Sequence, residues 1–186
     1  MVDPNYFIQT LPDYLPDNAI VCVDIGQNQM WATSLVIKKG QRFITQGGMA
    51  AMGSSLPMAI GAAFAEPDKT IISICGDGGF QLNIQELQTI YHHNLNIKII
   101  LLNNHCYGMI RQFQTQYFES RFQSSVVGYS CPDFNDVVSA YKIFIAANLT
   151  ELFKDNRPGF LEVIIDPNCK VLPKLSVGKP IEEQDE

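Results

Sequence analysis

The sequence predicts a three-layer α/β fold in which helices cover both faces of a parallel β-sheet. Short runs of β-branched and other apolar residues alternate along the chain with stretches typical of helices. Two of these runs, Thr70–Cys75 and Ile97–Leu102, are separated by a helical stretch, which is the spacing of a right-handed βαβ unit. The 186 residues are 46% hydrophobic and 17% charged, which suits one globular domain with a continuous core.

The other predicted elements extend this alternation in both directions. Further strands are expected at Ala19–Val23, Arg42–Thr45, Lys142–Ala146 and Phe160–Ile165. Further helices are expected at Tyr6–Tyr14, Ser55–Ala65, Asp133–Tyr141 and Leu149–Lys154. Between the two central strands, Asn83 is a helix-capping residue with Glu86 three positions later, so a helix should run from there to His92. We assign residues 1–170 to the domain and 171–186 to a C-terminal extension, and expect the chain to be loose from Pro167 onward.

Composition and charge argue against several classes of function. The net charge is −6 and no run of Lys or Arg is long enough to form a nucleic-acid-binding surface, which argues against that class of function. No segment is long and apolar enough to span a bilayer, and Met1–Pro4 does not begin a signal peptide, so no membrane association is expected. The five cysteines are scattered without a CxxC pair or a His/Cys cluster, so we expect reduced thiols in a cytoplasmic protein.

Polar residues follow each of the two central strands at its carboxyl end. Gly76–Gly79 (GDGG) comes directly after the first strand, and Asn103-Asn104 comes directly after the second. Because ligands of open parallel sheets bind at the carboxyl ends of the strands, Asp77 and Asn104 should lie near each other. Carboxylate and carboxamide oxygens suit Mg²⁺, while glycines and the start of the following helix suit a phosphate group. These residues therefore predict a site for a metal ion and a diphosphate.

Each cluster alone has an ordinary structural explanation. A GDGG sequence is a common turn after a strand, and Asn-Asn at such a place is usually a turn or a cap. Their occurrence at corresponding ends of one βαβ unit is far more specific. Neither GxGxxG nor GxxxxGK[ST] occurs, so binding of a nicotinamide cofactor or a nucleoside triphosphate has little support.

Several motifs resemble those of thiamine-diphosphate-dependent enzymes. The GDG of Gly76–Gly78, followed about two dozen residues later by Asn103-Asn104, matches the thiamine-diphosphate motif. The likeness is closest to the large, catalytic subunit of acetolactate synthase (acetohydroxyacid synthase). Three further stretches carry it in the same order: Asp24–Trp31 (DIGQNQMW) resembles DVGQHQMW, Gly48–Gly53 (GMAAMG) resembles GLGTMG, and Asn103–Gln114 (NNHCYGMIRQFQ) resembles NNxxxGMVxQWQ. The resemblance implies the diphosphate-binding domain of this family and its fold.

The resemblance also implies a role for each residue that matches a motif. Asp77 and Asn104 would bind Mg²⁺ through their side chains, and Cys106 through its backbone carbonyl. Met52 would be the apolar wedge that bends the thiamine diphosphate into a V shape, and backbone groups of Ala50 and Met52 would bond the aminopyrimidine. The implied cofactor-binding residues are Gly26, Gln27, Asn28, Ala50, Met52, Gly76, Asp77, Gly78, Gly79, Asn104, Cys106, Tyr107, Gly108 and Met109. The implied substrate pocket contains Met109, Gln112 and Phe113.

The same resemblance implies chemistry on small 2-oxo acids. One 2-oxo acid is decarboxylated, and the product then adds to a second 2-oxo acid in the synthases or is protonated in the decarboxylases. The family also needs a glutamate from a pyrimidine-binding domain, for which this chain has no room. We therefore expect a fragment of a longer enzyme or one subunit of a split enzyme, inactive alone. Its partner would be a pyrimidine-binding domain of the same or another chain, in a homodimer or homotetramer. FAD could bind only in a middle domain, which is missing from this chain.

Departures from the synthase pattern leave parts of the function open. Asn28 replaces a histidine, although both side chains can donate to a phosphate oxygen. Phe113 replaces a tryptophan beside the substrate, so acetolactate is not secured as the product. The aromatic and basic stretch from Arg111 to Phe122 has two interpretations, a substrate entrance at a subunit interface or an ordinary surface amphipathic helix. His105, next to the Asn-Asn pair, is a possible acid–base group.

Two other functions compete with the synthase reading. One is a subunit of a 2-oxo-acid decarboxylase split across two chains, such as a sulfopyruvate or phosphonopyruvate decarboxylase, although DIGQNQMW favours the synthases. The other is a non-catalytic cofactor-binding module, and the presence of both Asp77 and Asn104 counts against it.

Overall fold

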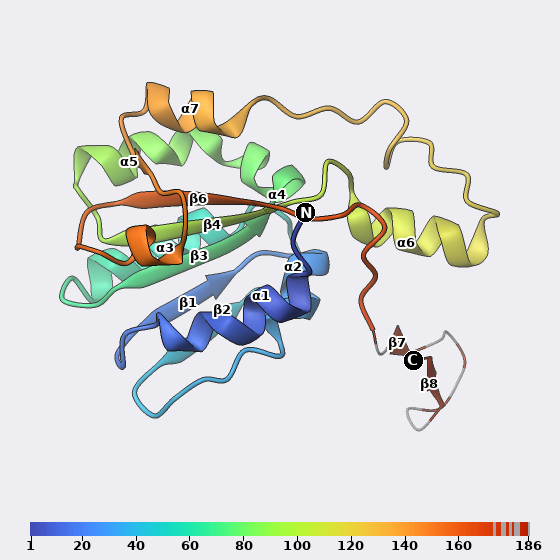
Figure 1. Cartoon of the computed structure of the whole chain (residues 1–186), viewed down its shortest axis with the longest axis horizontal. Helices are drawn as coiled ribbons and strands as arrows, with labels where there is room; N and C mark the ends of the chain where they lie inside the picture. Colours follow the sequence, from blue (N-terminus) through green and yellow to red (C-terminus); the bar gives the residue numbers. More distant parts are fainter. Residues whose placement is uncertain (173, 176–177, 179, 181–182, 186) are drawn as a thin grey trace.

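A six-stranded parallel β-sheet forms the centre of the computed structural model, which describes residues 1–172, 174–175, 178, 180 and 183–185. The strand order is β2 (Arg42–Thr45), β1 (Ile20–Val23), β3 (Ile71–Gly76), β4 (Ile97–Asn103), β6 (Gly159–Ile164) and β5 (Phe144–Ile145). All neighbouring strands in this sheet pair in parallel, so their carboxyl ends share one edge (Figure 1). The predicted α/β class is confirmed.

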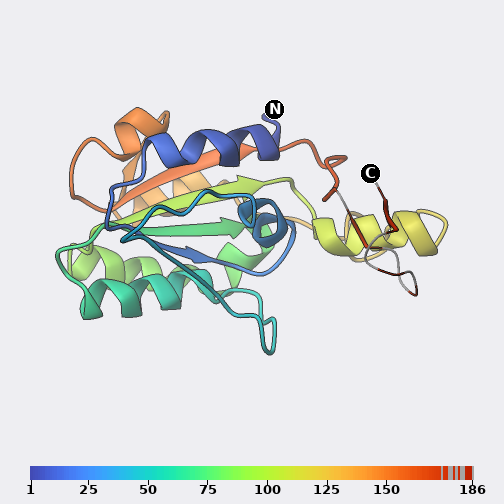
Figure 2. The same ribbon diagram turned by 90° about the horizontal axis from the view of Figure 1, so that it is seen from below.

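Helices cover both faces of the sheet, which makes three layers (Figure 2). One face carries α1 (Pro4–Thr10), α2 (Gln27–Ala32) and α8 (Leu149–Leu152). The other face carries α3 (Ser55–Ala65), α4 (Asp77–Leu82), α5 (Leu87–His92) and α7 (Phe134–Ala140). Successive strand residues point to opposite faces, so Val21 and Ile72 belong to one hydrophobic core and Ile20 and Ile71 to the other. None of the helices among the described residues is long and apolar enough to cross a membrane.

Most predicted elements lie where the apolar pattern placed them. Every predicted strand is present with boundaries that differ by at most two residues, and β2 and α3 have the predicted bounds. The first helix begins earlier than predicted, at Pro4, because Asp3 caps it by accepting a hydrogen bond from the Tyr6 N–H at 2.8 Å. It ends at Thr10 and continues as a 3₁₀ turn over Leu11–Asp13.

The prediction that Asn83 caps a helix is wrong. The helix after β3 begins six residues earlier, at Asp77, and the chain leaves it at Asn83 before a 3₁₀ turn (Ile84–Glu86) and α5. The Asn83 side chain makes no capping bond to the following turn. Its amide instead donates to the Gly53 carbonyl at 2.6 Å, which ties this helix to the loop before α3. GDGG is therefore a strand end and the first turn of a helix, not an isolated turn.

Helix α6 (Gly108–Tyr117) extends beyond the edge of the sheet at the carboxyl ends of the strands (Figure 1). Of the stretch from Arg111 to Phe122, the part up to Tyr117 is helical, and the residues after it are not. Ile110, Phe113, Tyr117 and Phe118, in or just after this helix, keep between 40% and 50% of their surface exposed.

The expectation of a loose chain from Pro167 onward is wrong for residues 167–171. Arg111 donates to the Pro167 carbonyl and to Asn168 Oδ1, and Gln112 exchanges two hydrogen bonds with the backbone of Val171. These contacts fasten the segment to α6 because its backbone groups find partners on the helix. Further along, β7 (Lys174–Leu175) and β8 (Gln184–Asp185) form an antiparallel pair.

Candidate functional site

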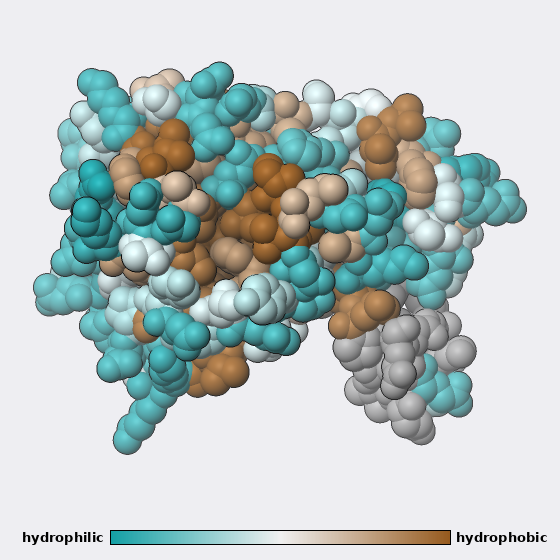
Figure 3. Space-filling view, in the orientation of Figure 1, coloured by the Kyte–Doolittle hydropathy of each residue, from teal (hydrophilic) through white to brown (hydrophobic). Residues whose placement is uncertain are grey.

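A cavity of about 70 Å³ lies at the carboxyl ends of β1, β3 and β4. It is lined by Ile25, Gly26, Gln27, Asn28, Trp31, Met52, Gly76, Asp77, Gly78, Gly79, Leu102, Asn104, Cys106, Tyr107, Gly108, Met109 and Ile110. Every residue predicted to bind the cofactor is in this set except Ala50. A larger hollow of about 470 Å³ lies beside α1, where apolar surface appears brown near the middle of Figure 3, and it contains none of them. The cavity at the strand ends is therefore the candidate site.

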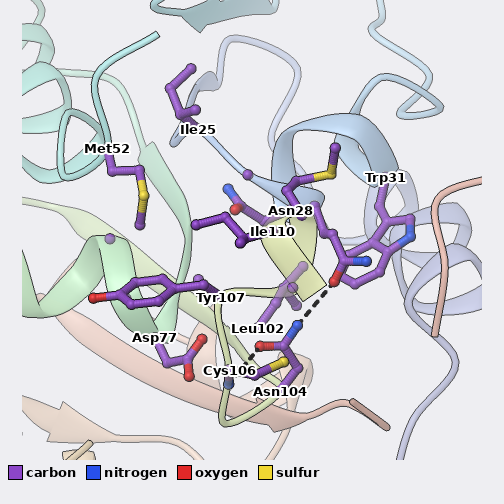
Figure 4. A pocket seen from close by; sticks show the side chains of 17 residues that line it. Ile25, Asn28, Trp31, Met52, Asp77, Leu102, Asn104, Cys106, Tyr107 and Ile110 are labelled. Carbon is purple, nitrogen blue, oxygen red and sulfur yellow. Dashed lines mark hydrogen bonds between the residues drawn. The ribbon is translucent and has the colours of Figure 1, made fainter. Parts of the chain in front are cut away.

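Neighbouring strand ends bring Asp77 and Asn104 into this cavity. Gly76 at the end of β3 pairs with Leu102 of β4. Asp77 directly follows Gly76, and Asn104 lies two positions after Leu102. The exposed fraction is 2% for Asp77 and 6% for Asn104. Figure 4 shows both side chains with Cys106 in the lower part of the view, below the Tyr107 ring. The adjacency on which the metal-site prediction depends is present.

The Asp77 carboxylate is buried at the first position of α4. Burial raises its pKa, whereas the Tyr129 hydroxyl, which donates to Oδ2 at 2.7 Å, lowers it. The backbone N–H groups of Asp77 and Gly78 and the nearby His105 lower this pKa as well. A buried carboxylate is stabilised most effectively by a cation. The electrostatics at this position therefore favour a bound metal ion.

Hydrogen bonds fix the orientation of the Asn104 carboxamide. Its Nδ2 donates to Gln27 Oε1 at 3.0 Å, and its Oδ1 accepts from the Cys106 N–H at 3.3 Å. The preceding Asn103 holds the turn instead, because it donates to Glu162 and accepts from the backbone that follows it. Within the Asn-Asn pair, only Asn104 lines the cavity.

Glycines let neighbouring side chains approach the backbone of the cavity wall. A β-carbon at Gly78 would lie 2.5 Å from the Tyr107 ring and 3.2 Å from Met52 Cε, and one at Gly79 would collide with Asp24 Oδ2. A β-carbon at Gly108 would lie 2.5 Å from Asn104 Nδ2. The first-turn N–H groups of α4 and α6 have no partner within their helices and can bond a phosphate oxygen. The wall thus suits an anionic group.

The ligand atoms in the cavity suit Mg²⁺. In the part of the chain that the structure describes, no three His, Cys, Asp or Glu side chains gather closely enough to hold a metal ion. A cation at Asp77 would therefore take its other ligands from oxygens such as Asn104 Oδ1 and the Cys106 carbonyl. Such oxygens are ligands of Mg²⁺ rather than of Zn²⁺. The residues present fit a metal ion together with a diphosphate.

Two residues of the site were not predicted from the sequence. Asp24 is fully buried and accepts hydrogen bonds from the N–H groups of Ile25, Gly53 and Ser54, so it fastens the loop that carries Met52. Its place directly after β1 was a signal for a functional role. Tyr129, which contacts Asp77, lies 52 residues further along the chain in a stretch without a recognisable motif.

Three predicted residues lie outside the cavity lining. Ala50 is exposed and has a positive φ of 51°. Gln112 lies behind the cavity, where its side chain binds Gln27 and the backbone of Val171. Phe113 is 44% exposed and packs against two aromatic rings of the same region, Tyr117 and Phe118.

Comparison with known proteins gives a family match over most of the chain. Residues 24–165 match the C-terminal TPP binding domain of thiamine pyrophosphate enzymes. The acetolactate synthase large subunit of Lactococcus lactis is 36% identical over an alignment of 186 positions, which covers 95% of this chain and 32% of that protein. The acetolactate synthase isozyme 2 large subunit of Escherichia coli is 35% identical, with coverage of 92% and 33%. A probable acetolactate synthase large subunit of Methanocaldococcus jannaschii is 35% identical, with coverage of 95% and 32%. The chain thus spans about a third of the length of these curated relatives.

Proposed function

Because the chain belongs to the thiamine pyrophosphate enzyme family and contains its C-terminal cofactor-binding domain, we propose that the cavity anchors the cofactor diphosphate through Mg²⁺. One observation carries this proposal. The ends of the neighbouring strands β3 and β4 place a buried carboxylate, Asp77, and an oriented carboxamide, Asn104, in one glycine-lined cavity. Burial of Asp77 without a cation is unfavourable, and a hard divalent ion relieves that cost.

The residues of the cavity divide into three groups by the part of the cofactor they would hold. Asp77, Asn104 and the Cys106 carbonyl would bind the metal ion. The backbone N–H groups of Gly78, Gly79, Gly108 and Met109 would meet the diphosphate, with Gly26, Gln27 and Asn28 closing over it. Met52, whose side chain lines the cavity, would support the bend of the cofactor. The bound cofactor supplies an electron sink for carbanion chemistry.

We propose that the complete enzyme acts on 2-oxo acids by decarboxylation and carboligation, as an acetolactate-synthase-like transferase or lyase. The identities of 34–41% with acetolactate synthases support this class. Phe113, at a position where the synthase motif has tryptophan, bears on which second 2-oxo acid is accepted. Any FAD would bind outside this chain, and the cytoplasm is the proposed location.

A partner domain is part of the proposal. The glutamate that activates the cofactor in this family belongs to a pyrimidine-binding domain, and we propose that such a domain, in a homo-oligomer, completes the site. The exposed apolar side chains of α6, which begins at the cavity, offer a surface for it. Alone, the chain should bind the cofactor without turnover.

Calorimetric titration of the chain with thiamine diphosphate tests the anchoring role. Binding should require Mg²⁺, and Asp77→Ala should abolish it, because the metal loses its charged ligand. Asp68→Ala is the matched control, since Asp68 is exposed and does not line the cavity. Unchanged binding by Asp77→Ala would remove the assignment.

Activity measurements separate the competing functions. Addition of a pyrimidine-binding domain from an acetolactate synthase should produce CO₂ from pyruvate together with a condensation product. Release of an aldehyde without condensation would favour a split decarboxylase, and cofactor binding without CO₂ would favour a non-catalytic module. The mass of the native polypeptide distinguishes a longer enzyme from a split one.

A further inference from the structure

Tyr129 contacts the proposed metal ligand Asp77 from a distant part of the chain. Its hydroxyl donates to Asp77 Oδ2 at 2.7 Å, although 52 residues separate the two. A carboxylate has two oxygens and several lone pairs, so this bond occupies part of one oxygen and leaves the other for a cation. A hydrogen bond to an ionised group is also stronger than a neutral one. Tyr129 therefore restricts the rotation of the Asp77 carboxylate.

A second tyrosine links Tyr129 to the cavity wall. The rings of Tyr107 and Tyr129 meet edge to face, with centroids 4.7 Å apart and an interplanar angle of 74°. The Tyr107 ring lies against Gly78, where a β-carbon would be 2.5 Å from it. Tyr129 therefore contacts Asp77 and Tyr107 contacts Gly78, so the two tyrosines fix two consecutive residues in the first turn of α4.

The segment that carries Tyr129 is itself fastened near the start of α6. The Tyr107 N–H donates to the Ser125 carbonyl at 3.0 Å, and the fully buried Ser125 hydroxyl bonds Gln114 Oε1. The Tyr129 N–H donates to the Val126 carbonyl at 3.2 Å. Residues 125–129 thus have a defined backbone path, and that path delivers the phenol to Asp77.

We propose that Tyr129 is a positioning residue for the metal site, which holds the Asp77 carboxylate in its ligating orientation and couples residues 125–129 to metal binding. This inference rests on the proposed function, because it assumes that Asp77 binds the cation. Groups that orient a metal ligand typically change metal affinity by about 10-fold or more when they are removed. Tyr129 acts through Asp77 and need not touch the cofactor.

The substitution Tyr129→Phe in the full chain removes the hydroxyl and keeps the ring that packs on Tyr107. Metal affinity would be measured with Mn²⁺ in the presence of thiamine diphosphate, from the EPR signal of free Mn²⁺. We expect the affinity to fall by about 10-fold. Tyr6→Phe, at a tyrosine that is 67% exposed, is the matched control and should leave the affinity unchanged.

Cleavage by trypsin after the exposed Arg121 tests the coupling, first in the unmodified chain and then in Tyr129→Phe. Mn²⁺ with thiamine diphosphate should slow this cut, and the slowing should be lost in Tyr129→Phe. An affinity in Tyr129→Phe equal to or tighter than that of the parent chain overturns the inference, as does a cut in the parent that the metal does not slow. Either of these two results leaves the proposed function intact, provided that the parent chain binds the metal and Asp77→Ala does not. If the parent chain fails to bind the metal, the proposed function itself fails.

Discussion

The Asp24 carboxylate accepts the backbone N–H of Gly53, at 3.0 Å to Oδ1 and 3.1 Å to Oδ2, across 29 residues of sequence. The same side chain accepts the N–H groups of Ile25 and Ser54, at 2.7 and 3.3 Å. It therefore joins the end of β1 to the loop that carries Met52. Burial raises the pKa of Asp24, and these hydrogen bonds lower it.

Asp24→Ala should destabilise the fold by about 2–3 kcal/mol, because it leaves buried N–H groups without acceptors. It should also weaken thiamine diphosphate binding, since the Met52 loop loses its attachment. Urea unfolding and calorimetry measure the two effects. Asp24→Asn keeps one acceptor oxygen and should lose less of both, and a stability of Asp24→Ala equal to that of the parent chain would contradict the assignment.

Gln112 makes three hydrogen bonds that join the C-terminal segment to the site. Its Oε1 accepts from the Val171 N–H at 2.9 Å and from Gln27 Nε2 at 3.0 Å, and its Nε2 donates to the Val171 carbonyl at 3.1 Å. Gln112→Ala should lower stability by about 1–2 kcal/mol and speed hydrogen exchange at the Val171 amide. Fluorescence of Trp31, the single tryptophan, offers a second readout because its indole N–H donates to the Lys170 carbonyl at 3.3 Å.

Gln85→Ala is the matched control for this test. Gln85 is exposed, and its amide donates to Asn83 rather than to the C-terminal segment. Exchange at Val171 should stay at the parent rate in this variant. Equal rates in both variants would show that Gln112 does not hold the segment.

Whether the sequence predicted a feature depends on how far apart in the chain the interacting residues lie. The strands and the adjacency of Asp77 to Asn104 depend on apolar runs and on polar residues directly after them, which are local features. The contact of Tyr129 with Asp77 depends on the path of a long loop, which no periodic pattern records. The false cap at Asn83 has the same origin, because the amide that a local rule assigned to its own helix is bound by the distant Gly53.

Lys98 is a buried cation in β4 whose charge should make stability depend on pH. Its Nζ donates to the carbonyls of Asp155 and Arg157, at 2.7 and 2.5 Å, and burial lowers its pKa from 10.5 to about 8. Between these two pKa values the unfolded chain binds the proton and the folded chain does not. Raising the pH through this window therefore favours the folded state as far as Lys98 is concerned.

Comparison with Lys98→Met isolates this contribution, because other groups titrate equally in both proteins. The unfolding free energy of the parent chain minus that of Lys98→Met should rise by about 3 kcal/mol from pH 7 to pH 11. Urea unfolding at several pH values measures this difference. A difference that stays constant or falls with pH would show that Lys98 keeps its charge in the folded state.

Gly108 and Gly61 form a matched pair that separates helix stability from the chemistry of the site. Both lie in helices, α6 and α3, but a β-carbon at Gly108 would crowd Gln27 Oε1 and Asn104 Nδ2, while one at Gly61 meets no atom within 4 Å. Gly61→Ala should therefore stabilise the fold by about 0.5–1 kcal/mol and leave cofactor binding unchanged.

Gly108→Ala lies at the first position of α6, so it gains less helix propensity than Gly61→Ala, and it must displace the bonded side-chain amides of Gln27 and Asn104. Mg²⁺-dependent affinity for thiamine diphosphate should fall by more than about 10-fold, because the metal loses an aligned ligand and the diphosphate loses its close approach to the backbone. Calorimetry on both variants measures the effect. A change in helix stability alone would move both variants in the same direction. Binding lost only in Gly108→Ala would therefore trace the defect to the contact with Gln27 and Asn104. Affinity equal to that of the parent chain in Gly108→Ala would count against the placement of the diphosphate at the start of α6.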